Sequence, residues 1–217
     1  MNILFPKSKG GKIRFFIIIG FAVILDLYVL FFVVNPLWAY KPQEGDIIFQ
    51  SLPKGILVNV IEGTTHSPFS HCGVVIKENN KWVVNEAIGT VHSTPLWIWI
   101  LRGRKLAIEV FRVKNPYSKF IPDFVNALNK YQDKPYDINY KMDDKNIYCS
   151  ELVYKAFRDS SQIKLGKLFT LGELDWKPYK NDIEMIEGGS VPTNRIMITP
   201  RHLSEAEELE KVYSFGY

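Results

Sequence analysis

Cysteine is scarce in this chain: Cys72 and Cys149 are the only two among 217 residues. Two cysteines are too few for a disulfide scaffold, so the fold must be held by a hydrophobic core, and this length is sufficient for one. Excess charge is also missing outside the N-terminus, because residues 1–34 carry a net charge of +3 and the rest of the chain only +1. A nearly neutral body lacks the basic surface of a nucleic-acid-binding protein, so nucleic acid is not an expected partner.

A long apolar run stands near the N-terminus. Phe15 to Val34 is a run of 20 nearly all apolar residues, interrupted by Gly20 and Asp26. As a helix it would be about 30 Å long, which is the thickness of the hydrocarbon core of a bilayer. Four basic residues precede the run, and they predict a single-pass membrane anchor with the following domain outside the cytoplasm. The alternative is a signal peptide cleaved after Ala39, which would release a secreted protein.

The sequence predicts two parts: residues 1–43 form a basic tip, a transmembrane anchor and a linker, and residues 44–217 form one α+β domain. In the second part, β-rich runs predict strands, and apolar residues at helical spacing predict amphipathic helices. The predicted strands are 47–49, 71–76, 81–87, 106–113 and 195–199. The predicted helices are 121–132, 149–159 and a short C-terminal helix that begins at Ser204. Residues 62–70 predict a loop, and residues 160–192 predict loops with short strands.

Cys149 stands at the expected first turn of the helix 149–159. Backbone N–H groups and the positive end of the helix dipole stabilise a thiolate at that position. The same N–H groups suit the oxyanion of a tetrahedral intermediate. These features predict a nucleophile, and the alternative for Cys149 taken alone is a small buried hydrophobic residue.

His71 and Glu86 are predicted to meet on one face of a hairpin. If Asn79-Asn80 is a two-residue turn, Gly73 lies opposite Glu86. Side chains alternate along a strand, so His71, Gly73 and Glu86 then share a face, with His71 and Glu86 as diagonal neighbours. Gly73 leaves space between them, and Glu86 would orient His71 as the base for a nucleophile. A register slip of one residue would put Glu86 on the opposite face.

Cys72 is predicted to point away from His71 and to pack in the core. A disulfide between Cys72 and Cys149 is an alternative that would prevent Cys149 from acting as a nucleophile. A second alternative is a zinc site formed by His66, His71 and the two cysteines. The spacing of these residues matches no compact zinc pattern, and the side chains of His71 and Cys72 would point apart in a strand.

Four motifs together resemble a known family. They are Gly45-Asp46-Ile47-Ile48-Phe49, Ser70-His71-Cys72-Gly73-Val74-Val75, Asn85-Glu86-Ala87 and Tyr148-Cys149-Ser150-Glu151-Leu152-Val153. Their order resembles the circularly permuted papain-like amidases of the YiiX/YaeF type, relatives of the NlpC-like cell-wall peptidases and of lecithin retinol acyltransferase. The resemblance implies a small barrel-like antiparallel sheet with packed helices, and it implies no metal and no organic cofactor. It also implies that Cys149 attacks a carbonyl, His71 transfers the proton and Glu86 orients His71.

Three functions are compatible with these residues. The first is a cysteine amidase or peptidase that cleaves amide bonds, with cell-wall peptides as the expected substrate. The second is a thiol acyl hydrolase or acyltransferase that acts on membrane lipids, a role that an exposed aromatic run at 97–101 would suit. The alternative interpretation of that run is a buried part of the core. The third is an inactive binding module that retains the fold.

Overall fold

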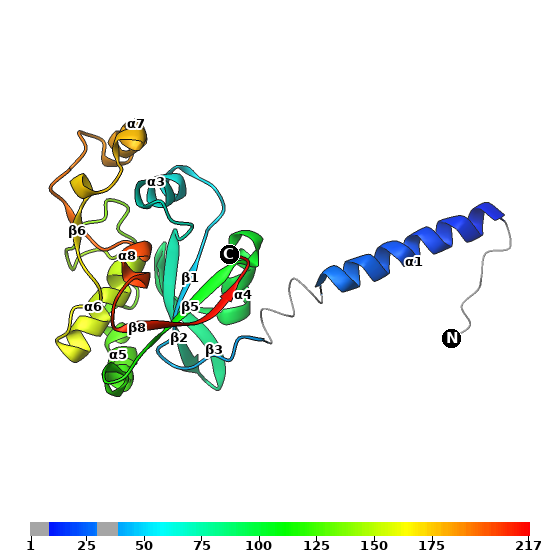
Figure 1. The fold of residues 1–217 in the computed structure, drawn as a ribbon, viewed down its shortest axis with the longest axis horizontal. Helices are drawn as coiled ribbons and strands as arrows, with labels where there is room; N and C mark the ends of the chain where they lie inside the picture. The colour runs from blue at the N-terminus through cyan, green and yellow to red at the C-terminus, as the bar shows by residue number, and fades with distance from the viewer. Residues whose placement is uncertain (1–8, 30–38) are drawn as a thin grey trace. The chain divides into compact units, whose positions relative to one another are not determined.

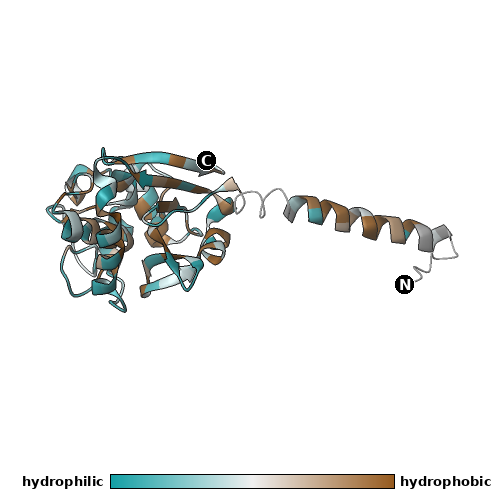
Figure 2. Cartoon of the chain, turned by 90° about the horizontal axis from the view of Figure 1, so that it is seen from below, coloured by the Kyte–Doolittle hydropathy of each residue, from teal (hydrophilic) through white to brown (hydrophobic). Residues whose placement is uncertain are grey.

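The structure is a computed structural model that describes residues 9–29 and 39–217. The chain divides between Lys41 and Pro42 into two compact units. The first contains helix α1, Lys9–Val29, whose residues are mostly hydrophobic (Figure 2). The predicted membrane span extends past the end of α1, so its last part lies outside the described residues. None of the helices within 9–29 and 39–217 is long and apolar enough to cross a membrane, and the predicted anchor is therefore not supported.

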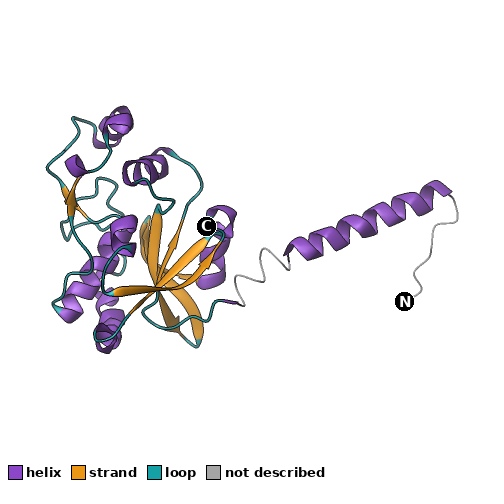
Figure 3. Ribbon diagram, viewed as in Figure 1, coloured by secondary structure: helices purple, strands orange, loops and turns teal. Residues whose placement is uncertain are grey.

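The second unit is built on a six-stranded sheet with the strand order β4-β3-β2-β1-β5-β8 (Figure 3). Every pairing in it is antiparallel. The strands are β1 Ile47–Gln50, β2 His71–Glu78, β3 Lys81–Ile88, β4 Thr90–Pro95, β5 Ile108–Val113 and β8 Leu209–Phe215. β1 lies in the middle of the sheet and is buried along its whole length, which explains its continuous apolar run.

The hairpin of β2 and β3 has the predicted register, with Glu78 opposite Lys81 and Gly73 opposite Glu86. Asn79 and Asn80 connect the strands with φ values of 48° and 62°. Asparagine tolerates this left-handed conformation, and two such residues match the twist of the flanking strands. The turn therefore fixes the register that places Glu86.

Helices cover both sides of the sheet (Figure 1). α6, Cys149–Ser161, contacts β2 and β3 and packs against α5, Ile121–Ala127. The predicted apolar face of α6 is fully buried, and its members are Leu152, Val153, Ala156 and Phe157. The predicted helix 121–132 is present as α5 followed by a 3₁₀ helix, Leu128–Tyr131. α4, Leu96–Arg102, lies on the other side of the sheet and contacts β3 and β4.

Two helices occupy segments that were predicted as loops. α3, Ile56–Thr65, includes the first part of the predicted loop 62–70, and α7, Lys180–Glu187, lies inside 160–192. The two helices contact each other. Both are short, and they bury Val60 and Ile61 of α3 and Ile183 of α7. The prediction failed because tertiary packing supplies most of the stability of such helices.

The predicted C-terminal helix is wrong. α8, Pro200–Ser204, ends where that helix was expected to begin, and the hydroxyl of Thr199 caps α8 by accepting from the N–H of His202. The residues that follow form β8, which pairs with β5 at the edge of the sheet. The predicted strand 195–199 is reduced to β7, Ile196–Met197, which pairs with β6, Phe169–Thr170. A nonlocal partner strand decides the conformation of β8, and local capping signals do not reveal that partner.

Candidate active site

Cys149 is the first residue of α6, as predicted, and its side chain is buried. Tyr148 precedes it in an extended conformation, and the Tyr148 N–H donates to the carboxylate of Glu151 over 3.2 Å. The hydroxyl of Tyr148 accepts from the N–H of Ile198 over 3.1 Å. These bonds hold the start of the helix in place, so the sulfur lies at the positive end of a 13-residue dipole.

His71 and Glu86 are brought together across the hairpin. His71 Nε2 lies 2.5 Å from Glu86 Oε2, and both side chains are almost completely buried. Because a carboxylate only accepts hydrogen bonds, Nε2–H is the donor, which leaves Nδ1 for the thiol of Cys149. Gly73 is necessary between them: a Cβ there would lie 2.8 Å from the carbonyl oxygen of Asn85 and 3.3 Å from the Cβ of Glu86.

Glu86 accepts from three further side chains besides His71. The hydroxyl of Thr94 donates to Oε1 over 2.6 Å, and the indole N–H of Trp99 donates to Oε2 over 3.0 Å. The guanidinium of Arg102 also bonds Oε2. Burial opposes the charge of Glu86, but the bonds and charges of His71 and Arg102 outweigh burial and lower its pKa to about 2. Glu86 is therefore a carboxylate throughout the physiological range.

The thiol and the imidazole form a coupled pair. Burial disfavours the imidazolium, but interactions with Cys149 and Glu86 raise the pKa of His71 to about 9. A hydrogen bond with the Cys72 thiol, together with the pairing with His71, lowers the pKa of Cys149 well below its usual range. Both shifts favour a thiolate beside an imidazolium, and the thiolate is the nucleophilic form of cysteine.

Cys72 lies in the hydrophobic core, as predicted, together with Val74 and Ile76. Burial raises the pKa of its thiol, so Cys72 stays protonated. Both cysteines are free. The sequence did not show that the Cys72 thiol reaches Cys149, because β2 and α6 meet only in the tertiary structure.

The sequence also did not reveal that α4 supplies Trp99 and Arg102 to the site. The two residues are three positions apart on the helix, so both reach Glu86 from the same face, and the Trp99 ring stacks on His71 with centroids 5.9 Å apart. The aromatic run 97–101 is therefore divided: Trp99 and Ile100 are buried, whereas the side chains of Trp97, Ile98 and Leu101 are exposed. The composition of the run did not show which of its side chains would be exposed and which buried.

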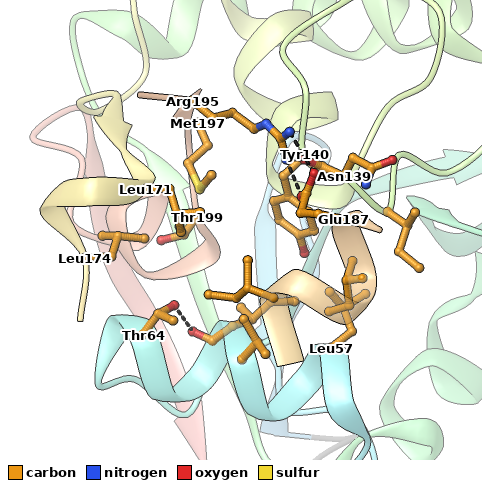
Figure 4. Close-up of a pocket in the computed structure, with 15 residues that line it drawn as sticks. Leu57, Thr64, Asn139, Tyr140, Leu171, Leu174, Glu187, Arg195, Met197 and Thr199 are labelled. Carbon is orange, nitrogen blue, oxygen red and sulfur yellow. Dashed lines mark hydrogen bonds and ion pairs between the residues drawn. The ribbon is translucent and has the colours of Figure 1, made fainter. Parts of the chain in front are cut away.

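The second unit also contains an apolar cavity (Figure 4). It is a small cavity of about 60 Å³ between α3, α7 and the loop containing Tyr140. Its walls are mostly aliphatic, with an ion pair between Arg195 and Glu187 at one side. Tyr140 belongs to the cavity wall and stacks on Tyr148 with ring centroids 4.2 Å apart. Because Tyr148 directly precedes Cys149, the cavity wall is connected to the nucleophile by one aromatic contact.

The antiparallel sheet, the packed helices and the chain order histidine, glutamate, cysteine define a permuted papain-like fold. Residues 41–213 match the family of permuted papain-like amidase enzymes, YaeF/YiiX, C92. The chain belongs to this family. The uncharacterized protein YiiX of Escherichia coli (strain K12) is 32% identical over 180 residues, which cover 82% of this chain and 89% of the relative. The crystal structure of metalloprotein yiiX from Escherichia coli O157:H7, DUF1105, superposes with a TM-score of 0.77 at 31% identity and covers 81% of this chain and 99% of its own.

That structural neighbour is described as a metalloprotein, which raises the question of a metal in this chain. Within the described residues, no three histidine, cysteine, aspartate or glutamate side chains are grouped as metal ligands. His71 Nε2 and both oxygens of Glu86 are already used in hydrogen bonds. Glu86 and the Nε2 atom of His71 are therefore engaged by groups of the protein and are not free to bind a metal ion in this arrangement.

Proposed function

We propose that this chain is a cysteine amidase or peptidase that uses Cys149, His71 and Glu86. The observation that supports this best is the buried chain of contacts from the Cys149 thiolate through the His71 imidazole to the Glu86 carboxylate. In this proposal, Cys149 attacks the amide carbonyl and forms a tetrahedral intermediate. The backbone N–H groups at the start of α6 are the donors available to its oxyanion.

Proton transfer falls to His71. The imidazolium donates its proton to the leaving amine, and an acyl-enzyme remains on the Cys149 sulfur. The neutral imidazole then takes a proton from the attacking water, and the sulfur leaves as a thiolate beside the restored imidazolium when the acid product is released. Glu86 holds the Nε2–H, so Nδ1 faces the reacting atoms in every step.

Covalent labelling with iodoacetamide tests the nucleophile. We expect the wild-type chain to be alkylated at Cys149 far faster than at Cys72 at neutral pH, because the pKa of the Cys149 thiol is lowered whereas that of the Cys72 thiol is raised. Cys149→Ala should abolish the labelling, and His71→Ala should slow it. An inert Cys149 in a folded protein would refute the enzyme and favour the binding module, and equal labelling of both cysteines would also count against the mechanism.

A second candidate is a thiol acyl hydrolase or acyltransferase that acts on membrane lipids. The apolar cavity beside Tyr140 favours it, because an aliphatic wall suits an acyl chain better than a cell-wall peptide. The exposed side chains of Trp97, Ile98 and Leu101 on α4 also suit contact with a lipid surface.

Substrate protection separates the two candidates. The chain is incubated with cell-wall peptides or with phospholipid vesicles before labelling of Cys149. If peptides slow the labelling and are cleaved, the amidase is supported. If vesicles protect and fatty acid is released by the wild type but not by Cys149→Ala, the acyl hydrolase is supported and the peptide substrate is wrong.

The apolar run at 15–34 leads us to place the domain outside the cytoplasm, next to the membrane, where cell-wall peptides and lipids are both within reach. Cell fractionation tests this location. We expect the full chain to stay with the membrane after a high-salt wash and to be degraded by protease added from outside. Recovery in the soluble cytoplasmic fraction would refute both the location and the anchor.

A further inference from the structure

Arg102 has a specific place beside the proposed catalytic residues. Its guanidinium and the imidazole of His71 both bond the same oxygen of Glu86, Oε2. Glu86 is completely buried, whereas the side chain of Arg102 is 27% exposed. One carboxylate oxygen therefore accepts from two cationic groups. Each cation weakens the attraction between the carboxylate and the other cation.

Other contacts make this arrangement rigid. Thr94 occupies the second oxygen of Glu86, and Trp99 approaches Oε2 from the same helix as Arg102. Because Trp99 also stacks on His71, α4 contacts the imidazole and its carboxylate at the same time. Both oxygens of Glu86 are therefore held by other donors, so the carboxylate cannot shift if the His71 ring moves.

We propose that Arg102 is a positioning residue that fixes Glu86 Oε2 for His71 and sets the upper pH limit at which the imidazolium persists. This inference deepens the proposed function and rests on it. Cys149 and Glu86 both stabilise the imidazolium, whereas the guanidinium takes part of the charge of Glu86 and repels the imidazolium, so His71 loses its proton at a lower pH than it would without Arg102.

Arg104 provides a matched control. It lies two residues further along the chain and pairs with another buried carboxylate, Glu62, through the same type of contact. Glu62 makes its other bonds to Ser51 and Lys54 and has no bond to the residues around His71. Neutralising Arg104 therefore removes a comparable ion pair without changing the charge at Glu86.

The test is a titration of the His71 imidazole by NMR in the full chain, which has only four histidines. We expect Arg102→Gln to raise the pKa of His71 by about one unit. Arg102→Lys and Arg104→Gln should leave it within a few tenths of a unit. An unchanged His71 in Arg102→Gln, or an equal shift in Arg102→Lys, would overturn the proposal, since Arg102 would then be structural only.

A second measurement, on the wild type, tests the proposal even if Arg102→Gln does not fold. The side-chain nitrogen signals of Arg102 should titrate with the same midpoint as His71, and signals that stay flat through that midpoint would also overturn the proposal. Iodoacetamide labelling of the same samples distinguishes failure of the proposed function from failure of the proposed role of Arg102. An inert wild-type Cys149 refutes the proposed function, whereas a reactive Cys149 with an unshifted His71 refutes the role of Arg102 alone.

Discussion

At the scale of single residues, the site is governed by the buried carboxylate of Glu86 and the cations that neutralise it. Glu86 is buried with four donors around it, and its anion stabilises the imidazolium of His71. The contribution of His71 to stability is fully present below its ordinary pKa of 6.5 and is lost as the pH rises through about 9. The contribution of Glu86 to stability is fully present above its ordinary pKa of 4.5 and is lost as the pH falls through about 2. Both contributions are complete only between about pH 4.5 and pH 6.5.

Glu86→Gln should lower the pKa of His71 by about one to two units, because the imidazolium loses its counter-charge. The thiolate then loses part of its own partner, so alkylation of Cys149 at neutral pH should slow by a few-fold. The measurement is the rate of iodoacetamide labelling in buffers from acidic to alkaline pH. Glu109→Gln is the matched control, since Glu109 is a buried carboxylate of the same sheet that pairs with Lys211. A wild-type profile in Glu86→Gln would remove Glu86 from the mechanism.

At the scale of elements, the hairpin of β2 and β3 and the first turn of α6 position the reacting groups. Gly73 allows the strands to pair closely at the point where His71 reaches Glu86. α6 is anchored beneath the site by a buried ion pair, because Lys155 and Glu151 are one turn apart and both are almost fully buried. Burial raises the pKa of Glu151 to about 7, even though Lys155 and the N–H of Tyr148 favour its charged form.

Gly73→Ala should destabilise the protein by about 1–3 kcal/mol, because the new methyl group would contact a side chain of β3 at 2.5 Å and a backbone oxygen at 2.8 Å. Displacement of β3 also moves Glu86, so labelling of Cys149 should slow. Urea unfolding and iodoacetamide rates measure the two effects. Gly55→Ala is the control, because no atom lies within 4 Å of a Cβ placed there. Equal stability of the two variants would mean that the sheet adjusts without cost.

Lys155→Met should lower the free energy of unfolding by about 3 kcal/mol, because it leaves the buried Glu151 without its cation. The variant also raises the pKa of Glu151 further, so the loss should be larger at pH 8 than at pH 5. Urea unfolding at both pH values measures this. The control is Lys180→Met in the exposed pair with Glu184 on α7, which should cost less than about 0.5 kcal/mol. A loss that does not vary with pH would show that Glu151 does not titrate in this range.

At the scale of the whole molecule, the main hydrophobic cluster belongs to the second unit. Among the described residues, the main cluster begins at Ile47 and ends at Leu209, and it joins β1, β2 and α6 to the C-terminal segment. The α1 helix belongs to the other unit. The stability of the domain should therefore not depend on the N-terminal residues.

A shortened chain of residues 39–217 should unfold at the same urea concentration as the full chain and with the same dependence on urea, because both expose the same core on unfolding. Its Cys149 should also label at the same rate. Circular dichroism in urea and the iodoacetamide rate provide the measurements. A lower midpoint for the shortened chain would show that the N-terminal residues stabilise the domain.

The sequence by itself determined the elements whose signals are local. The Asn79-Asn80 turn fixed the register of the hairpin and the face shared by His71 and Glu86, and apolar spacing defined α6 with Cys149 at its start. Only the tertiary structure decided what depends on distant partners. α3 and α7 are stabilised by contact with each other, and β8 is a strand because β5 offers an edge. The approach of Arg102 to Glu86 and of Cys72 to Cys149 likewise follows from packing, because side chains far apart in sequence meet only after the sheet and its helices have assembled.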